Sequence, residues 1–207
     1  MVILAAGRST RLGRPKQLLP YLGHTLIEHS VEVAIASEAQ EVVVVLGSHP
    51  EAIREKLEGL PIQVVVNDEW LEGMGSSIRA GVKALPPNIG CVVIALCDQP
   101  TVTPDLIREL AERHFEAGSP IVASSYDGVV GAPCAFGREL FLKLLELSGD
   151  SGARDLIRNS PNPVDLVSFQ GGNLDVDTPE DFQRLVAMDQ NGEPDALKYE
   201  IKNRQTP

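Results

Sequence analysis

Short, continuous apolar runs that alternate with amphipathic stretches constrain the fold of this chain most strongly. Two of these runs, Val42–Leu46 and Val92–Leu96, consist of aliphatic, largely β-branched residues without alternating polar positions. Such runs are typical of strands that are buried on both faces, as in a parallel sheet covered by helices. The alternation of strand and helix predicts an α/β fold with a mostly parallel sheet. Ligands bind to such sheets at the carboxyl ends of the strands.

The expected elements cover most of the chain. The predicted strands are Val2–Ala6, Glu41–Leu46, Ile62–Asn67, Cys91–Leu96, Pro120–Ser124, Val129–Phe136 and Val164–Ser168, with Asn173–Val176 as a further candidate. The predicted helices are Thr25–Ala36, Pro50–Leu57, Ser76–Leu85, Pro104–Ala117, Arg138–Leu147, Gly152–Asn159 and Pro179–Met188. Proline is favoured in the first turn of a helix, and Thr103 and Thr178 each precede such a proline as expected N-caps.

The length and composition indicate one globular domain. The chain has 207 residues, of which 43% are hydrophobic and 23% charged, so neither wholesale disorder nor a collagen-like fold is expected. We expect a single domain over residues 1–188 and a polar tail over residues 189–207. The apolar runs are too short to span a membrane, and the N-terminal run lacks the basic lead-in of a signal peptide. Three cysteines form an odd, sparse set that fits the reducing cytoplasm.

The net charge of −11 is distributed unevenly along the chain. Four cations precede the first acidic residue, Glu28, and they are Arg8, Arg11, Arg14 and Lys16. A uniformly acidic surface argues against nucleic-acid binding. The cationic segment, which also contains glycine, predicts a loop that binds an anion. A turn with solvated surface cations is the alternative interpretation.

This cationic loop follows the first predicted strand. It has neither the Walker A spacing nor the glycine spacing of a dinucleotide fingerprint. Small residues let the backbone approach a ring or a phosphate closely, and successive N–H groups can form an anion-binding nest. The residues expected to surround a nucleotide here are Leu4, Ala5, Ala6, Gly7, Arg8 and Ser9. Arg11 and Lys16 are placed to neutralise phosphate oxygens.

Three aspartates are candidate metal ligands. Asp98 directly follows an apolar strand, where it either forms a turn before Pro100 or binds Mg²⁺. Asp175 and Asp177 are two residues apart, so in an extended segment they face the same way. Asp177 alternatively caps the helix predicted to begin at Pro179.

Several motifs follow the loop in a characteristic order. They are Gly73-Met74-Gly75-Ser76-Ser77, Cys97-Asp98-Gln99-Pro100, Gly131-Ala132-Pro133, Gly149-Asp150-Ser151-Gly152-Ala153-Arg154 and Asp175-Val176-Asp177-Thr178-Pro179-Glu180-Asp181. With the loop pattern Leu-Ala-Ala-Gly-x-Ser-x-Arg-x-Gly-x-Pro-Lys-x-Leu-Leu-Pro, they cover residues 2–182. Together these motifs resemble the nucleotidyltransferases of sugar phosphates and of the molybdenum cofactor. The resemblance is greatest to the molybdenum cofactor cytidylyltransferases.

The resemblance implies a Rossmann-like, three-layer α/β/α fold of the nucleotide-diphospho-sugar transferase type. It implies that Arg11 and Lys16 are catalytic, and that Asp98 and Asp177 hold Mg²⁺, with Asp175 as the alternative to Asp177. It assigns nucleotide contacts at a helix N-terminus to Gly75, Ser76 and Ser77, although a plain capped helix is the alternative there. The implied acceptor-binding residues are Gly131, Pro133, Asp150 and Arg154, and an ordinary loop is the alternative for the last two.

The implied reaction is nucleotidyl transfer, in which an acceptor phosphate attacks the α-phosphorus of a nucleoside triphosphate and pyrophosphate leaves. The Ala5-Ala6 pair favours CTP, because a methyl at Ala6 would crowd a purine. The implied acceptor is molybdenum-molybdopterin, and the implied protein partner is a molybdoenzyme or its chaperone in transient contact. The alternatives are a guanylyltransferase, a sugar-phosphate nucleotidyltransferase and a non-catalytic nucleotide-binding or cofactor-chaperone protein.

Overall fold

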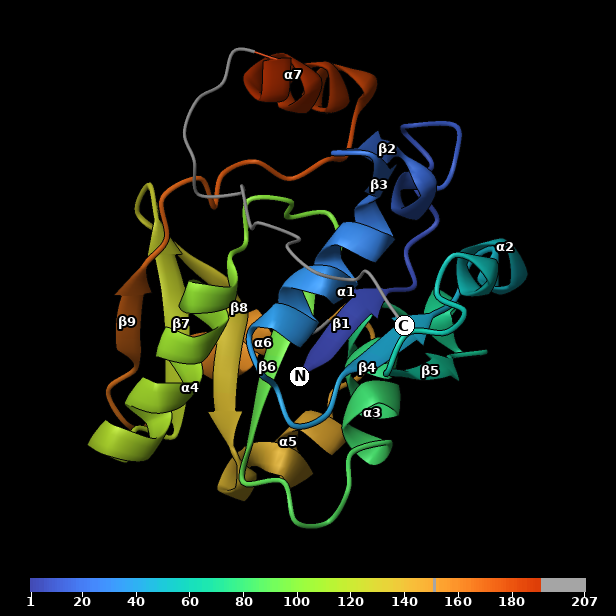
Figure 1. Cartoon of the computed structure of the whole chain (residues 1–207). Helices are drawn as coiled ribbons and strands as arrows, with labels where there is room; N and C mark the ends of the chain where they lie inside the picture. Colours follow the sequence, from blue (N-terminus) through green and yellow to red (C-terminus); the bar gives the residue numbers. More distant parts are fainter. Residues whose placement is uncertain (151, 191–207) are drawn as a thin grey trace, which may run out of the picture.

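The computed structural model describes residues 1–150 and 152–190. These residues form a seven-stranded sheet with the order β5-β4-β1-β6-β8-β7-β9 and a separate two-stranded hairpin (Figure 1). The strands of the large sheet are β1 Val2–Ala5, β4 Val43–Leu46, β5 Gln63–Val66, β6 Cys91–Leu96, β7 Ile121–Tyr126, β8 Val129–Gly137 and β9 Asp165–Ser168.

The direction of the strands confirms the mostly parallel sheet predicted from the apolar runs. The pairs β1–β4, β4–β5, β1–β6 and β7–β9 are parallel, whereas β8 runs antiparallel to both β6 and β7. All four residues of β1 and of β4 are buried. This burial on both faces explains why these strands have no alternating polar positions.

Helices cover both faces of the sheet, which confirms the three-layer architecture (Figure 1). The helices are α1 Leu26–Ala36, α2 Pro50–Glu55, α3 Met74–Lys83, α4 Pro104–Ala117, α5 Phe141–Leu145, α6 Ala153–Arg158 and α7 Pro179–Gln190, with short 3-10 turns at Lys16–Leu18, Trp70–Glu72 and Arg138–Leu140. The hydroxyl of Thr103 accepts a hydrogen bond from the Leu106 N–H, so the predicted N-cap of α4 is confirmed.

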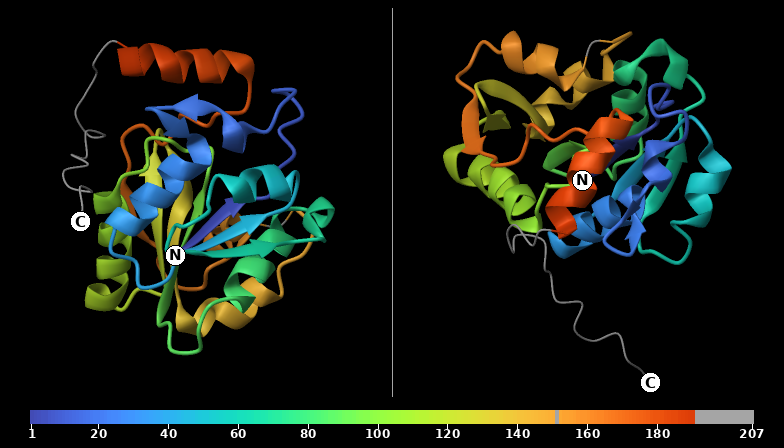
Figure 2. Two further views of the ribbon diagram at one scale, coloured as in Figure 1. Left: turned by 45° about the vertical axis from the view of Figure 1, so that its right-hand side comes forward. Right: turned by 90° about the horizontal axis from the view of Figure 1, so that it is seen from above.

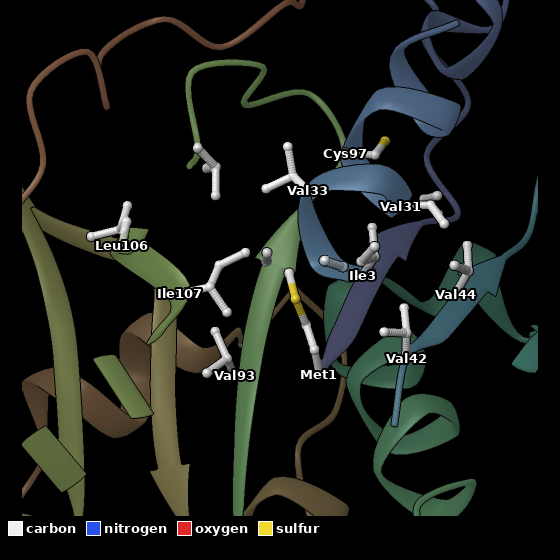
Figure 3. Close-up of a cluster of buried hydrophobic side chains, with 14 of the residues drawn as sticks. Met1, Ile3, Val31, Val33, Val42, Val44, Val93, Cys97, Leu106 and Ile107 are labelled. Atoms are coloured by element: carbon white, nitrogen blue, oxygen red, sulfur yellow. The ribbon is translucent and has the colours of Figure 1, made fainter. Parts of the chain in front are cut away.

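Two apolar clusters join the layers. Figure 3 shows the first cluster, in which aliphatic side chains of β1, β4 and β6 meet those of α1 and α4. The second cluster lies on the other face of the sheet, where the strands meet α3 and α5. Each fully buried valine, leucine or isoleucine contributes roughly 1.5–3 kcal/mol relative to leaving it exposed. These clusters therefore fix the sheet whose carboxyl edge carries the candidate site.

A third apolar cluster ties the two ends of the described chain together. The hairpin strands β2 Pro20–Tyr21 and β3 His24–Thr25 follow the cationic loop, and α7 lies over the carboxyl edge of the sheet next to them (Figures 1 and 2). Leu19, Leu26, Leu174, Val176 and Leu185 are buried in this cluster with Tyr21. The segment around residues 174–177 is consequently held beside the cationic loop.

The candidate strand Asn173–Val176 is not formed, and this expectation was wrong. The segment contains a turn followed by irregular chain. The Val176 N–H donates to the Asp98 carbonyl oxygen at 2.9 Å, while Leu174 and Val176 are buried in the third cluster. Its apolar residues therefore reflect packing rather than a place in the sheet.

No helix among residues 1–150 and 152–190 is long and apolar enough to cross a membrane. Of the predicted polar tail, residues 191–207 lie outside the described residues.

Candidate active site

The site lies where the carboxyl ends of two central strands meet. Strands β1 and β6 are parallel neighbours, so the loops after Ala5 and Leu96 emerge at the same edge of the sheet. The first loop carries Lys16, and the second begins with Cys97 and Asp98. The Val176 N–H, bonded to the carbonyl oxygen of Asp98, brings the segment of Asp177 to the same place.

Four charged side chains form one ionic cluster at this edge. The Lys16 ammonium donates a hydrogen bond to Asp98 Oδ2 and another to Asp177 Oδ1, the latter at 2.8 Å. The Arg11 guanidinium donates to Asp177 Oδ2 at 2.7 Å. Lys16 and Asp98 are largely buried, with 12% and 14% of their side chains exposed, whereas Asp177 is 36% exposed. The structure thus brings all four of these predicted site residues together.

The pKa shifts in the cluster follow from this geometry. Burial alone would lower the pKa of Lys16, but the Asp98 carboxylate, together with Asp177, raises it above its ordinary value. Burial alone would raise the pKa of Asp177, but the hydrogen bond and charge of Lys16, helped by Arg11, hold it below its ordinary value. Lys16 is therefore a fixed positive charge at neutral pH, and Asp177 is a fixed negative charge.

Asp98 and Asp177 fit a divalent cation that binds together with a phosphate ligand. Asp98 Oδ1 is buried and has no hydrogen-bond partner, so one carboxylate oxygen remains available to a ligand. Within the part of the chain that the structure describes, no group of three or more histidine, cysteine or acidic side chains is arranged to hold a metal. Mg²⁺ is commonly bound by one or two carboxylates plus substrate phosphates, and this donor set matches that pattern.

Asp175 and Asp177 have different surroundings. Asp177 contacts Lys16 and Arg11, whereas Asp175 lies near Gln99, which acts to lower its pKa against the effect of burial. Burial, followed by the nearby Asp98 charge, raises the pKa of Asp175 above its ordinary value. The carboxylate of Asp177 is engaged by the two cations, and the cap of α7 is instead provided by the Thr178 hydroxyl, which accepts from the Asp181 N–H at 3.2 Å.

A cleft of about 420 Å³ opens beside the ionic cluster. It is lined by Leu4, Ala5, Ala6, Gly7, Lys16, Trp70, Leu71, Gly73, Met74, Ser77, Leu96, Cys97, Asp98 and Asp150. Four of the six residues predicted to surround a nucleotide in the first loop therefore line the cleft. Of the other two, Arg8 is exposed, and Ser9 accepts a hydrogen bond at its hydroxyl from the Lys16 backbone N–H at 3.0 Å.

Gln17 and Trp70 shape the cleft, and neither was predicted from the sequence. The buried Gln17 amide nitrogen donates to the carbonyl oxygens of Ala5 at 2.7 Å and Gly7 at 3.0 Å, which fixes the turn of the loop. Trp70 lies against Gly47, where an added Cβ would be 2.7 Å from the tryptophan side chain and 2.8 Å from Ala6 Cβ. Glycine at this strand end lets Trp70 approach Ala6.

The motif of residues 73–77 builds the opposite wall of the cleft. Gly73 has φ +114°, and a Cβ there would lie 2.3 Å from the Gly149 carbonyl oxygen. The Gly75 N–H donates to that same carbonyl group at 3.1 Å. The hydroxyls of Ser76 and Ser77 both accept from the buried Asn67 amide, and Ser76 also donates to the Gly73 carbonyl. Within this motif, the groups of Gly75 and Ser76 are engaged in holding the wall, while Ser77 lines the cleft.

The four predicted acceptor-binding residues do not all lie together. Asp150 lines the cleft together with the cationic loop. Gly131 and Arg154 lie together, because a Cβ at Gly131 would be 3.6 Å from the Arg154 guanidinium. Pro133 follows a cis peptide bond, and its carbonyl oxygen accepts from the Ser124 hydroxyl at 2.7 Å inside the sheet. Ser151 of the same motif lies outside the described residues.

Comparison with known proteins identifies the family. Residues 1–164 match the family model described as the MobA-like NTP transferase domain. The chain belongs to the MobA-like NTP transferase family. Nucleotidyltransferases of this type have the α/β fold seen here.

Full-length relatives of this MobA-like chain carry different names. It is 38% identical over 194 residues to "Nicotine blue oxidoreductase" of Paenarthrobacter nicotinovorans, an alignment that covers 89% of this chain and 95% of the relative. It is 31% identical over 195 residues to "Purine catabolism protein PucB" of Bacillus subtilis, covering 89% and 94%.

A solved structure also matches the MobA-like chain along most of its length. The Rv0371c protein of Mycobacterium tuberculosis, crystallised in complex with manganese, is 33% identical with a TM-score of 0.77, and the match covers 90% of this chain and 96% of that one.

Proposed function

We propose that this protein transfers CMP from CTP to the terminal phosphate of molybdenum-molybdopterin and releases pyrophosphate, in the cytoplasm and in transient contact with a molybdoenzyme or its chaperone. The observation that carries the proposal is the convergence of Lys16 on both Asp98 and Asp177 beside an open cleft. The three residues come from distant parts of the chain, and no requirement of the fold alone explains a cation held between two carboxylates at this edge. The family membership supports the reaction class.

The chemistry that the site must perform is the approach of two anions. An oxygen of the acceptor phosphate forms a bond to the α-phosphorus of CTP, and the bond from that phosphorus to the pyrophosphate oxygen breaks. Because the nucleophile is already anionic, no residue has to remove a proton. The demand on the protein is to offset charge repulsion and to align the reacting groups.

The charged residues can meet that demand. Lys16 supplies a positive charge that is fixed at neutral pH. Arg11 is paired with Asp177 and has 66% of its side chain exposed, so its remaining N–H groups are accessible to a phosphate. Asp98 and Asp177 would hold Mg²⁺, with Asp98 Oδ1 available as a ligand atom. When bound, Mg²⁺ neutralises phosphate oxygens and stabilises the charge of the leaving group.

The side of the cleft near Ala6 supports CTP as the nucleotide. Trp70 and the Ala6 methyl meet over Gly47, and both residues line the cleft, so together they limit its width on this side. A pyrimidine needs less width at this position than a purine. A guanylyltransferase of the same family is the alternative. In that case Ala6 and Trp70 would have to move apart to admit the larger purine.

A pyrophosphate-release assay tests the proposal. Purified protein is incubated with Mg²⁺ and molybdenum-molybdopterin, with CTP or GTP in parallel, and with a sugar 1-phosphate as a second acceptor. We expect release with CTP and the molybdenum cofactor, and a loss of about 10² or more in rate for Lys16→Ala. Lys143→Ala, on an exposed position of α5, is the matched control and should keep the wild-type rate.

Three outcomes would reject the proposal. Preference for GTP would assign the protein to the guanylyltransferase branch, and turnover of the sugar phosphate alone would assign it to the sugar nucleotidyltransferases. CTP binding without any pyrophosphate release would indicate a binding protein. A parallel assay of dye reduction with a reduced nicotinamide nucleotide covers the activity in the name of the Paenarthrobacter relative.

A further inference from the structure

Tyr126 was assigned no role by the sequence motifs. Burial raises its pKa, and it lies close enough to Asp175 for the charge of that carboxylate to raise the pKa further. It is the last residue of β7, and its ring packs edge-on against Phe169 with the ring centroids 5.7 Å apart. A Cβ at Gly172 would lie 2.4 Å from the tyrosine ring, so glycine at this position leaves the space that the ring occupies. The position of the ring is therefore fixed from two sides.

The hydroxyl of Tyr126 is directed to the same point as the Arg154 guanidinium. The Cβ that residue 131 would carry lies 3.1 Å from the tyrosine oxygen and 3.6 Å from an arginine nitrogen. The two polar groups therefore converge over Gly131, which has no side chain to separate them. A hydroxyl donor and a guanidinium at one point form a pair of groups suited to a phosphate.

Gln99 connects this pair to the metal-binding side of the site. Gln99 lies close enough to both Tyr126 and Asp175 to act on the pKa of each side chain, lowering it against the effect of burial. Gln99 Oε1 is buried and has no hydrogen-bond partner, so the amide nitrogen is the atom of Gln99 that can donate toward these two side chains. A phenolic oxygen can accept from an amide nitrogen and still donate its own O–H to a ligand.

Arg154 also lines a groove that shares no residue with the nucleotide cleft. It has a volume of about 480 Å³ and is lined by Val129, Val130, Arg154, Ile157, Arg158, Val164 and Leu166. Its walls are apolar apart from the two arginines, although the chain as a whole carries a net charge of −11. This combination suits a molecule whose ring faces pack against aliphatic side chains and which also carries an anionic group.

We propose that Tyr126 and Arg154 hold the attacking phosphate of the acceptor, and that the groove beyond Arg154 takes the ring system of the same molecule. This inference rests on the proposed function and extends it to the acceptor. Tyr126 is a positioning residue for the phosphate, because it touches the acceptor and takes no part in bond making or breaking. In this arrangement the site extends from the candidate metal ligand to the acceptor groove through a succession of neighbouring residues, namely Asp98, Gln99, Tyr126 and Arg154.

The kinetic test uses Tyr126→Phe, which keeps the ring and its packing and removes only the hydroxyl. We expect the acceptor KM to rise about tenfold, as for the loss of a hydrogen bond to a charged group, while the CTP KM and kcat stay within twofold, roughly the noise of such comparisons. Arg108→Gln, an arginine of α4 whose guanidinium donates to the Ala36 carbonyl oxygen, is the matched control. An unchanged acceptor KM, or an equal rise in the CTP KM, would overturn the assignment.

A binding test separates this inference from the proposed function. Phenyl phosphate and inorganic phosphate are titrated into the protein and followed by NMR. We expect Tyr126→Phe and Arg154→Gln to weaken both ligands about tenfold, and Leu166→Ser, on the groove wall, to weaken phenyl phosphate alone. These results would support the site even if the wild-type protein released no pyrophosphate with any acceptor. Equal affinities of the wild-type protein and these variants for both ligands would reject the site even if the enzyme proved active.

Discussion

Replacing Lys16 by methionine tests the ionic cluster in the most informative way. Methionine keeps the length and apolar stem of lysine and removes its charge. Asp98 would then have no hydrogen-bond partner on either oxygen, because Lys16 is the partner of Oδ2 and Oδ1 has none. Both side chains are largely buried, and breaking a buried ion pair in this way costs about 3–5 kcal/mol. The contact with the more exposed Asp177 adds little.

Thermal unfolding of Lys16→Met measures this cost. For a domain of this size each kcal/mol lowers Tm by about 2–4 °C, so we expect a fall of about 6 °C or more. Lys143→Met, an exposed lysine of α5, should change stability by no more than about 0.5 kcal/mol. A variant with the wild-type Tm would show that the Lys16 ammonium is not paired with Asp98 in solution.

Addition of Mg²⁺ without nucleotide extends the same experiment. In the wild-type protein the Lys16 ammonium contacts both carboxylates and, together with Arg11, balances their charge, so Mg²⁺ should raise Tm little. In Lys16→Met the carboxylates are free to bind the cation, and Mg²⁺ at ten times its Kd should restore roughly 1.4 kcal/mol. An equal effect of Mg²⁺ on both proteins would refute competition between the ammonium and the cation for Asp98 and Asp177.

Three further predictions address the walls and charges of the site. Gly73→Ala should destabilise the protein by about 1–3 kcal/mol and raise the CTP KM. The added Cβ would collide with the Gly149 carbonyl, and the backbone φ of +114° at this position is strained for alanine. An unchanged Tm and unchanged kinetics would contradict the wall described for residues 73–77. Ala6→Gly should increase the kcat/KM ratio of GTP over CTP in the pyrophosphate assay, and an unchanged ratio would remove Ala6 from base selection. The stability lost in Asp177→Asn should be fully present at neutral pH. It should decrease as pH falls from the ordinary aspartate value of 3.8 through the depressed pKa of Asp177, because the carboxylate stabilises the fold only while it is ionised. A stability difference between the two proteins that does not change in acid would point to another cause.

The strands and the meeting of the charged residues follow from the sequence because they depend on strong local signals. The β-branched runs of β4 and β6 leave no other place for these segments than a buried sheet. Asp98 and the loop of Lys16 follow parallel strands directly, so the geometry of the sheet brings them to one edge. Their proximity needed no knowledge of side-chain packing.

The features that the sequence analysis missed depend on contacts between distant residues. The hairpin β2–β3 turns at Leu22 and Gly23, which both have positive φ. Turns of this kind usually carry Asn-Gly or Asp-Gly. Because leucine stands at the first position here, the sequence carries no signal for the turn. Gln17 and Asn67 are uncharged amides. Each stabilises the site by donating to a carbonyl or hydroxyl oxygen that only the folded chain brings within reach. Pattern alone does not distinguish them from surface amides.

The central claim is that Asp98, Asp177 and Lys16 surround one metal-bound nucleoside triphosphate. A crystal structure with CTP and Mn²⁺, in which the anomalous signal locates the manganese, tests it most directly. We predict manganese bonded to carboxylate oxygens of Asp98 and Asp177, with the Lys16 ammonium on a phosphate oxygen. Manganese or triphosphate bound elsewhere, with Lys16 still between the two aspartates, would contradict the account.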